Sequence, residues 1–577
     1  MAKKYLFVAE ADKIQEMLFR FARQRQVLGG SRLLVKLGDD VENLARGYGG
    51  KALISRGGNF RLVFDTKDNI DAFGEKLSLF YRLLLDSEIT IAGYEEYEEN
   101  NSNSFKAAND KLLQKLRQYK QAERGRADEP HSPITAFCQD SGSGLASVHN
   151  ILLSGETDTK YLSQAALDMG HAGGLGRYSQ DQEDETELDD DFLSSISEKI
   201  ENVPLKEFKW PQVPEQIGRL DRLHNNVAYL LADANGMGKI FDNCSDENEL
   251  AKLSVTLDEV IRSAVAAPIP KLYNNLKELM IKPGQNEPEK LFPLLPLILA
   301  GDDVFILLPA FYALDYARQF CLEFQKLMRK ELSENTLFRK LKEKIENNDL
   351  SYPTISAAVV FCKTKYPYHL AHQRGAALLN QAKNFTKTYA ENNKQFPCLG
   401  FEIVIGNQLV KPAPPEPLRY VNSMNPFWLQ TPSQPEIAKK SVALEKLLNS
   451  RFALKNMPRK RLAELREFFS PEHLPEDDDD TKWARRIQNW IARSKTVHTN
   501  TQWINALEKA LAELGNGAAN PEKPTSIEIV TWRDVDRHYG QKIRMHHGMP
   551  DLIEVWDYAQ DLETPLRKYK EDIDETN

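Results

Sequence analysis

Two adjacent carboxylates, Asp302 and Asp303, interrupt the apolar run of residues 297–309. The apolar residues on either side, several of them β-branched or aromatic, predict two buried strands. Gly301 then predicts a tight turn, which would place both acids at the tip of an antiparallel hairpin. Because an unpaired buried carboxylate is costly, the tip is expected to face either solvent, as an ordinary turn, or a divalent cation with phosphates.

A second apolar run, residues 227–233, also ends in a carboxylate, Asp233. A glycine-containing turn follows at residues 234–239, before a segment that can begin a helix. Glycine lets the backbone approach a phosphate closely, and the free N–H groups of a helix N-terminus favour an anion. The three acids at two strand ends therefore predict a metal and nucleotide site, in which two ions about 3.5–4 Å apart would clamp the reacting oxygens.

The composition of the 577-residue chain fits a protein of about three to four domains with hydrophobic cores, because 41% of its residues are hydrophobic. The net charge of -9 gives no global basic field for nucleic acid, so any RNA contact is expected from local patches or other subunits. The five cysteines form no CxxC pair, which argues against a disulfide scaffold and an intact zinc site. The first residues read as a strand rather than a signal peptide, and no apolar stretch is long enough to span a membrane. A cytoplasmic protein without a membrane partner is therefore expected.

Residues 1–95 predict an α/β unit that folds as a ferredoxin-like palm. A strand comes first and precedes a helix over residues 14–27, whose apolar residues recur on one face. Gly29 is expected to begin the next helix. A hairpin around Gly57 and Gly58 follows, and a further helix completes the β-α-β-β-α order.

Residues 221–410 predict a second ferredoxin-like palm, because the order of strands and helices repeats that of the first unit. The hairpin that carries Asp302 lies in this second palm. Residues 96–220 are less regular and are expected to form a linker region with helical segments. Residues 430–577 predict a mostly helical domain. The predicted fold class is therefore α+β, with two nucleotide-cyclase-like palms, the linker region and a C-terminal helical domain.

Several of these stretches match the motifs of a known family. Its Gly-Gly-Asp-Asp hairpin reads Ala-Gly-Asp-Asp here, at residues 300–303, and its Asp-Gly-Asp-Asn-Met-Gly-Lys turn reads Asp-Ala-Asn-Gly-Met-Gly-Lys, at residues 233–239. The strand and helix at residues 356–383 are also similar, and residues 57–60 are similar to the family's non-catalytic first palm. The chain thus resembles the large palm-domain subunit, the polymerase–cyclase subunit, of type III CRISPR effector complexes in its Cmr-like branch. The resemblance covers roughly residues 5–65 and 220–410.

This resemblance implies that ATP is converted to cyclic oligoadenylate when target RNA is bound, with other CRISPR effector subunits and a guide RNA as partners. Asp233, Asp302 and Asp303 would be the catalytic residues and would hold Mg²⁺ or Mn²⁺. Lys383 falls where related diguanylate-cyclase palms place a basic residue. The residues expected to contact the nucleotide are Ala234, Asn235, Gly236, Gly238, Lys239, Gly301, Ser356 and Lys383.

The chain departs from the family's pattern in three places. No N-terminal HD nuclease domain is expected, because the chain opens on the first palm. The two CxxC pairs of the family's zinc ribbon read Cys-Gln-Asp-Ser at residues 138–141 and Leu-Ser-Gln-Ala-Ala at residues 162–166. One thiol is too few for tetrahedral zinc, so this degenerate zinc ribbon is expected to hold no zinc. Asn235 stands where the family's turn has a second acid, which leaves three acids for the metal ions.

Two other functions stay open at this point. One is a catalytically weak structural subunit of a CRISPR-type complex, which the degenerate zinc ribbon and the missing nuclease domain favour. The other is a standalone cyclic nucleotide synthase. The first palm offers Asn59 and Phe60 where catalytic acids would be, so it is expected to hold no metal. It is predicted instead to pack against the second palm and complete a pocket that brings two ATP molecules together.

Overall fold

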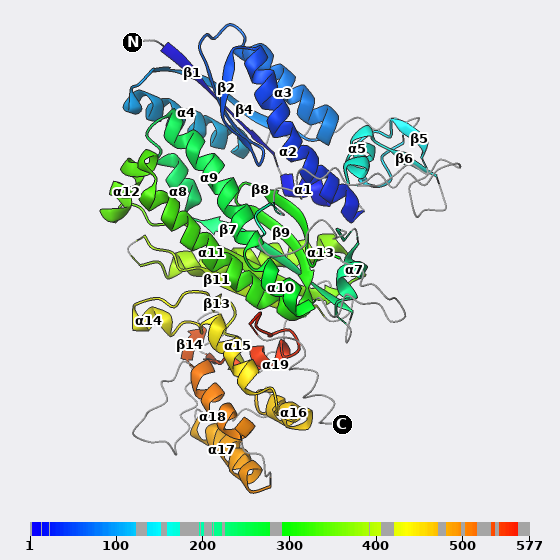
Figure 1. The fold of residues 1–577 in the computed structure, drawn as a ribbon, viewed down its shortest axis with the longest axis vertical. Coiled ribbons are helices and arrows are strands. Elements are labelled where there is room, and N and C mark those ends of the chain that lie inside the picture. Colours follow the sequence, from blue (N-terminus) through cyan, green and yellow to red (C-terminus); the bar gives the residue numbers. More distant parts are fainter. Residues whose placement is uncertain are drawn as a thin grey trace.

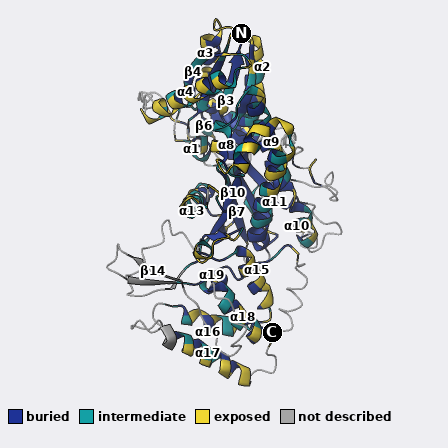
Figure 2. Cartoon of the chain, turned by 90° about the vertical axis from the view of Figure 1, so that its left-hand side faces the viewer, coloured by how far each residue is buried: buried dark blue, intermediate teal, exposed yellow. Residues whose placement is uncertain are grey.

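The computed structural model describes residues 3–12, 14–21, 23–122, 136–142, 144–151, 159–173, 196, 198–200, 210–211, 213–221, 225–276, 291–391, 393–404, 421–470, 480–497, 502–515, 532–536 and 542–563. These residues form three tiers along the long axis of the molecule (Figure 1). The first palm lies at one end, the second palm in the middle and the C-terminal helices at the other end. Figure 2 shows that the buried residues gather in the sheets and on the inward faces of the helices.

The first palm has the strand order and helix placement of a ferredoxin-like fold. Its elements are β1 (Lys3–Ala11), α1 (Ile14–Phe19), α2 (Gln24–Gly47), β2 (Gly50–Arg56), β3 (Asn59–Phe64), α3 (Ile70–Leu85), β4 (Ile89–Glu98) and α4 (Ser102–Gln121). The sheet is antiparallel, in the order β2-β3-β1-β4. α2 and α3 cover the face that carries Phe7 and Leu62, and α4 packs on the other face, which carries Leu6 and Val8.

The predicted boundary between the first two helices is wrong. α1 ends at Phe19, and α2 begins at Gln24 and runs through the glycine pair that was expected to start it. A Cβ atom on Gly29 would lie 1.8 Å from the Met169 carbonyl oxygen, and one on Gly30 would lie 2.5 Å from Leu18. The two glycines are therefore needed for close packing inside the helix, and they do not mark its start.

The second palm repeats the first and then extends it. Its strands are β7 (Asn226–Asn235), β8 (Leu295–Ala300), β9 (Asp303–Pro309), β10 (Thr354–Lys363), β11 (Cys398–Ile403) and β13 (Phe427–Trp428). Its helices are α8 (Met237–Asp242), α9 (Glu247–Ala266), α10 (Ile269–Leu276), α11 (Ala313–Glu334), α12 (Arg339–Glu346) and α13 (Tyr368–Thr388), with 3₁₀ turns η2 (Ala310–Tyr312) and η3 (Thr336–Phe338). The order β8-β9-β7-β10 matches β2-β3-β1-β4, which confirms the predicted duplication. β11, parallel to β10, and then β13 widen the sheet.

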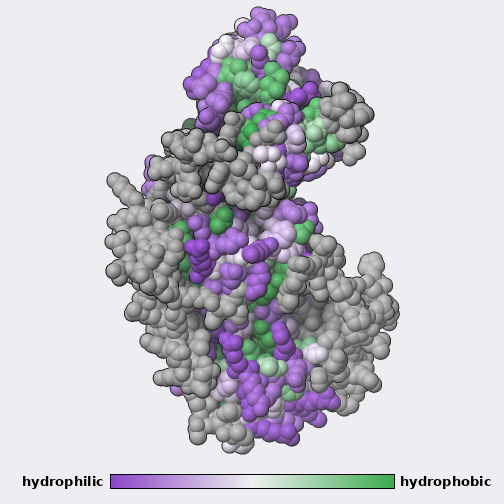
Figure 3. Space-filling view, turned by 90° about the vertical axis from the view of Figure 1, so that its right-hand side faces the viewer, coloured by the Kyte–Doolittle hydropathy of each residue, from purple (hydrophilic) through white to green (hydrophobic). Residues whose placement is uncertain are grey.

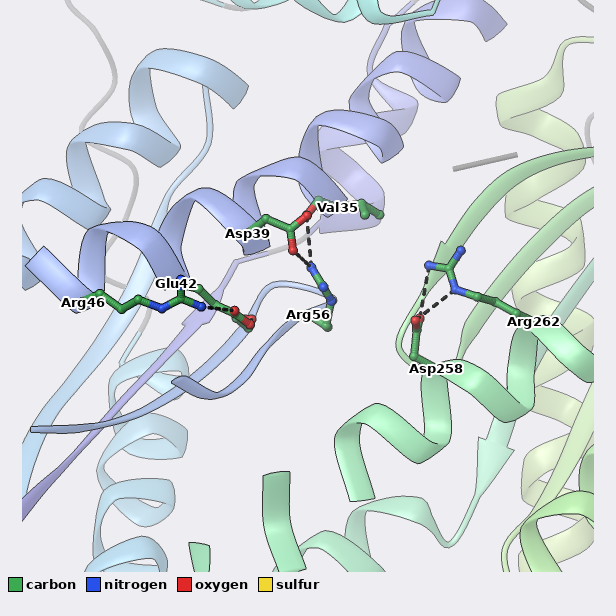
Figure 4. A network of polar contacts seen from close by, with 8 residues as sticks. Val35, Asp39, Glu42, Arg46, Arg56, Asp258 and Arg262 are labelled. Carbon is green, nitrogen blue, oxygen red and sulfur yellow. Dashed lines mark hydrogen bonds and ion pairs between the residues drawn. The ribbon is translucent and has the colours of Figure 1, made fainter. Parts of the chain in front are cut away.

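The two palms pack against each other reciprocally. α2 of the first palm contacts β8 of the second, and α9, its counterpart in the second palm, contacts β2 of the first. In Figure 4, Arg56 of β2 donates to Asp39 Oδ1 at 2.5 Å and to the Val35 carbonyl at 3.5 Å, both on α2. On the facing α9, Arg262 pairs with Asp258 at 2.9 Å. A helix of each palm thus packs on the equivalent edge strand of the other palm, as a pseudo-two-fold relation requires.

The linker region, predicted to begin at residue 96, begins only after α4, which belongs to the first palm, and it contributes small elements beside that palm. They are β5 (Val148–Ile151), β6 (Lys160–Leu162), α5 (Gln164–Ala172) and α7 (Pro214–Gly218). Gln26 of α2 donates to the buried Asp140 carboxylate at 2.9 Å, and Lys160 pairs with the same carboxylate at 2.9 Å. Asp140 belongs to the stretch that resembles a zinc ribbon, and here an amide and a cation satisfy it. Cys138 of this stretch accepts hydrogen bonds from Ser141 and Ser163.

The C-terminal tier is mostly helical, as predicted. Its helices are α14 (Pro435–Ala438), α15 (Leu444–Ala453), α16 (Arg459–Phe468), α17 (Asp480–Val497), α18 (Gln502–Leu514) and α19 (Met549–Glu554). A three-stranded sheet that the sequence did not predict joins them: β12 (Val421–Asn422), β14 (Trp532–Asp536) and β15 (Lys542–His546). Tyr558 stacks on Phe361 with ring centroids 4.8 Å apart and accepts a hydrogen bond from Asn226, so this tier is docked on the second palm.

Two further features concern the helices and the surface of the described residues. None of the helices in the described ranges is both long enough and apolar enough to cross a bilayer. A groove of about 620 Å³ lies between α3 and β4 of the first palm. On the face shown in Figure 3, apolar side chains gather on this palm, where Leu79 and Leu83 are exposed. None of the residues predicted to hold the nucleotide lines that groove.

Candidate active site

The predicted acid hairpin is present. β8 and β9 pair antiparallel with Ala300 opposite Asp303, so Gly301 and Asp302 are the two residues of the turn. Gly301 has a φ of 65°, which suits glycine, and a Cβ there would meet nothing within 4 Å. Glycine is therefore required by the backbone of this turn and not by crowding around it.

Asp233 lies beside this hairpin because β7 is the neighbour of β9. Ala232 is opposite Val304 in that pairing, so the next residue pair along the strands brings Asp233 to Asp303. Both side chains point to the face of the sheet that carries Tyr229 and Phe305, because side chains alternate along a strand. The structure therefore brings the three predicted acids together at one corner of the second palm.

The acids carry more negative charge than their surroundings neutralise. Burial, and after it the charges of Asp233 and Asp303, raise the pKa of Asp302 to about 7. Burial and the charge of Asp233 raise the pKa of Asp303 to about 6, although a hydrogen bond from Gln15 and the charge of Lys383 act in the opposite direction. A cluster of carboxylate oxygens that resists ionisation fits a divalent cation in both charge and ligand type.

The side chains are nevertheless not arranged around an ion. Within the described part of the chain, no group of three or more His, Cys, Asp or Glu residues has the arrangement of a metal-binding site, the three acids included. Asp233 instead forms an ion pair through Oδ2 with Lys383 Nζ of α13, and the two side chains are 28% and 20% exposed. Lys383, which was expected to contact a phosphate, here contacts a carboxylate.

The turn after β7 offers backbone beside open space. Gly236 has a φ of 80° and precedes α8, and neither it nor Gly238 would bring a Cβ within 4 Å of another residue. Gly238 and Lys239 are exposed, whereas Ala234 is buried in the core below the sheet. Of this stretch, the glycines and the lysine are accessible to a ligand.

Asn235 and Ser356 lie inside the protein. Asn235 Nδ2 donates to Thr354 Oγ1 at 3.1 Å and to Ser356 Oγ at 2.8 Å, and Ser356 Oγ also accepts the Cys398 N–H at 3.3 Å. Ser356 is fully buried, and Asn235 is only 3% exposed. The two side chains tie β7, β10 and β11 together, and the structure does not bring them to the surface beside the acids.

The first palm contributes to this corner, a contact that the sequence did not predict. Gln15 of α1 hydrogen bonds to Asp303. Phe19, on the same short helix, stacks on His372 of α13 with ring centroids 3.7 Å apart and meets Phe305 of β9 edge-on at 5.3 Å. Because nearly 300 residues separate Gln15 from Asp303, no local pattern could have indicated this contact.

Several solved structures align with the chain at low identity. The chain aligns with a Csm1–Csm4 cassette in complex with cA4 at 13% identity and a TM-score of 0.44, covering 88% of this chain and 70% of that one. Csm1 of T. onnurineus aligns at 12% identity with a TM-score of 0.45, covering 88% of this chain and 67% of that one. An apo Csm1–Csm4 cassette aligns at 13% identity with a TM-score of 0.38, covering 70% of this chain and 54% of that one. The chain thus spans between about half and seven tenths of the length of these structures.

Sequence comparison gives a more local result. No curated protein matches the chain. A family model does match one part of it, and that part holds the acid hairpin, the turn after β7 and Lys383. Residues 226–390 match the second palm domain of Cas10/Cmr2.

Proposed function

We propose that this chain is a Cas10-type subunit of a type III CRISPR effector complex and converts ATP to cyclic oligoadenylate when the complex binds target RNA. The observation that carries the proposal is the meeting of Asp233, Asp302 and Asp303 at one corner of a palm whose sequence matches the Cas10/Cmr2 second palm. Guide RNA, other effector subunits, a cytoplasmic location and membership of the Cmr-like branch belong to the same proposal, as does the absence of zinc.

The reaction is the in-line attack of a ribose hydroxyl on an α-phosphate, with pyrophosphate leaving. Asp233, Asp302 and Asp303 would hold Mg²⁺ or Mn²⁺, which when bound stabilises the charge that develops on the phosphate oxygens. The backbone at Gly236 and Gly238 lies open for phosphates, and Lys239 is exposed beside it. Gln15 of the first palm orients the Asp303 carboxylate through its hydrogen bond.

The first palm also forms part of the proposed nucleotide pocket. Its α1 lies against β9 and α13, so that the acid corner is walled on one side by the first palm. We infer that the pocket for donor and acceptor nucleotide is completed there. Holding two ATP molecules in one pocket removes the entropic cost of their encounter.

A catalytically weak structural subunit is the second candidate. It is favoured by the arrangement of the three acids, which is not that of a metal site, and by the Lys383–Asp233 ion pair. The two candidates differ in one measurable property, the metal-dependent binding of ATP.

Calorimetry of a non-hydrolysable ATP analogue with Mn²⁺ separates the two. The double variant Asp302→Ala, Asp303→Ala is expected to lose about 10-fold or more in affinity, since contacts to charged groups are worth roughly 1.5–3 kcal/mol each. The matched control is Asn59→Ala, at the equivalent hairpin position of the first palm, which should bind like the wild type. Equal affinity for the ATP analogue in the wild type and the double variant would show that Asp302 and Asp303 do not form the metal and nucleotide site.

A further inference from the structure

The Lys383–Asp233 ion pair has a counterpart in the first palm. Lys120 Nζ lies 2.6 Å from Glu10 Oε1. Glu10 is opposite Asn59 in the pairing of β1 with β3, as the register places Asp233 beside Asp303. Lys120 lies on α4, the helix after β4, and Lys383 lies on α13, the helix after β10. In both palms, therefore, a lysine from equivalent helices (α4 and α13) pairs with an acid from equivalent strands (β1 and β7).

A second contact supports this equivalence independently. Asp12 accepts a hydrogen bond from Thr90 at 2.6 Å in the first palm, and Asn235 donates to Ser356 at 2.8 Å in the second. Thr90 is opposite Glu10, and Ser356 is opposite Asp233. The acid–lysine pair thus belongs to a duplicated corner of the fold and is not an accident of one side-chain rotamer.

The two corners differ in the charge that the lysine must balance. In the first palm, Lys120 lies on Glu10 and 3.5 Å from Asp12, and the hairpin adds no acid because it carries Gly58 and Asn59. In the second palm Lys383 contacts Asp233, and the hairpin adds Asp302 and Asp303 close by, so three carboxylates lie near one ammonium group. One ammonium group thus faces two carboxylates in the first palm and three in the second, so the excess negative charge is larger in the second palm.

We propose that Lys383 is an internal cation that holds the place of the metal on Asp233 in the nucleotide-free protein, and that metal binding releases it to the triphosphate. This proposal rests on the function proposed above and adds how that site is kept closed. An ammonium group and a divalent ion compete for the same oxygen, Asp233 Oδ2. Lysine suits the exchange because its charge sits on a flexible four-carbon stem and offers three donors that a phosphate can accept.

One consequence is a coupling between metal and nucleotide. Without nucleotide, the ion must displace Lys383 and leave its ammonium group without an anion. With nucleotide, the displaced ammonium group gains the phosphates. Each ligand therefore binds more tightly in the presence of the other, and the coupling is the same in both directions.

The test is Mn²⁺ binding to the full chain without nucleotide, measured by calorimetry and by the paramagnetic signal of free Mn²⁺. Lys383→Gln is expected to bind Mn²⁺ more tightly than the wild type, by about 5-fold or more, the lower end of typical coupling between sites. Lys383→Met, whose stem fills similar space without charge, should do the same. Lys383→Arg keeps a cation on Asp233 and should bind Mn²⁺ like the wild type.

Lys120→Gln is the matched control in the first palm. It breaks the equivalent ion pair where no hairpin acids stand, so Mn²⁺ affinity and stoichiometry should not change. Unchanged or weaker Mn²⁺ binding in both neutral Lys383 variants would overturn the proposal, provided that Asp302→Ala, Asp303→Ala still abolishes binding. If that double variant also binds Mn²⁺ like the wild type, the function proposed for the acids fails as well, so the two failures are distinguishable.

Discussion

The hairpin β2–β3 of the first palm and the hairpin β8–β9 of the second have the same register, and their turns differ in one backbone angle. Arg56 lies opposite Asn59 as Ala300 lies opposite Asp303. The residues at the positions of Asp302 and Asp303 are therefore Gly58 and Asn59, and the predicted assignment of Asn59 and Phe60 is wrong by one residue. The first turn residue is glycine with a positive φ in both, 58° at Gly57 and 65° at Gly301. The second turn residue has a φ of 71° at Gly58, whereas Asp302 is not among the residues with a positive φ.

This difference decides which turn can carry an acid. Positive φ at both central residues, the pattern of a type I′ turn, favours glycine twice, whereas positive φ at the first alone, the pattern of a type II′ turn, leaves the second position open to other residues. The first palm has a further restriction, because a Cβ on Gly58 would lie 2.3 Å from Ile14 Cδ1. The first palm therefore has the same hairpin as the second, but its turn has no room for an acid at the position of Asp302.

The largest effect is expected where the two palms meet. Phe19→Ala removes the ring that stacks on His372 and meets Phe305, which loosens α1 over the acid corner. Product formation by the assembled complex should fall by about 100-fold, because a displacement of about 1 Å is enough for such a loss. Binding of the ATP analogue to the second palm should change little, since the three acids remain.

Leu83→Ala is the control for this variant, because Leu83 lies on α3 of the same palm with 59% of its surface exposed. It should leave both product formation and analogue binding unchanged. A wild-type rate of product formation in Phe19→Ala, or in residues 221–410 without the first palm, would contradict a pocket shared by the two palms.

A smaller effect is expected from the two turns themselves. Gly58→Ala should lower the free energy of unfolding by about 2–4 kcal/mol, from roughly 1–2 kcal/mol of left-handed strain and the clash with Ile14. Gly301→Ala carries the strain alone, because nothing lies within 4 Å of its Cβ, and should cost about 1–2 kcal/mol. Urea denaturation of the two variants measures the difference. Equal losses of unfolding free energy would show that the Ile14 side chain moves away from the new Cβ atom at no cost.

The parts of this comparison that the sequence predicted are the local ones. Alternation of apolar residues and the glycine turns sufficed for both hairpins and for the repeated strand order. The start of α2 was missed because Gly29 and Gly30 are explained only by Met169 and Leu18, which pack against them. Packing partners distant in sequence leave no periodic signal.

The composition of the acid corner was harder to predict than its position. The hairpin and the strand end fixed where Asp233, Asp302 and Asp303 lie. Ser356 accepts a hydrogen bond from Cys398 of β11, the strand that pairs with β10 from more than forty residues away. The contact of Gln15 with Asp303 depends on how the palms dock. Short-range patterns place a side chain on a strand, whereas its partners are set by tertiary contacts.

The smallest expected effect is the pH dependence of the metal-free protein, and it separates the acid turn from its acid-free counterpart. The pKa values of Asp302 and Asp303 are raised to about 7 and about 6, above the ordinary aspartate value. A carboxyl group with a raised pKa in the folded state contributes stability below its unfolded pKa, near 4, and this contribution is lost as pH rises through the folded pKa. Wild-type stability should therefore decline relative to Asp302→Asn between about pH 4 and pH 7.

At pH 8 Asp302→Asn should accordingly melt above the metal-free wild type, by roughly 2–4 °C, the shift that about 1 kcal/mol gives in a large domain. At pH 4 the two melting curves should coincide. Saturating Mn²⁺ should raise the melting temperature of the wild type at pH 8 and leave that of Asp302→Asn nearly unchanged. Only the complete set of Asp233, Asp302 and Asp303 is expected to bind the ion and be stabilised by it. Asn59→Asp in the first palm adds a carboxylate beside Glu10, which Lys120 already pairs, so its pH dependence should be weaker than that of the second palm. A variant at Asp302 that melts below the wild type at every pH would mean that this acid supports the turn and does not repel its neighbours.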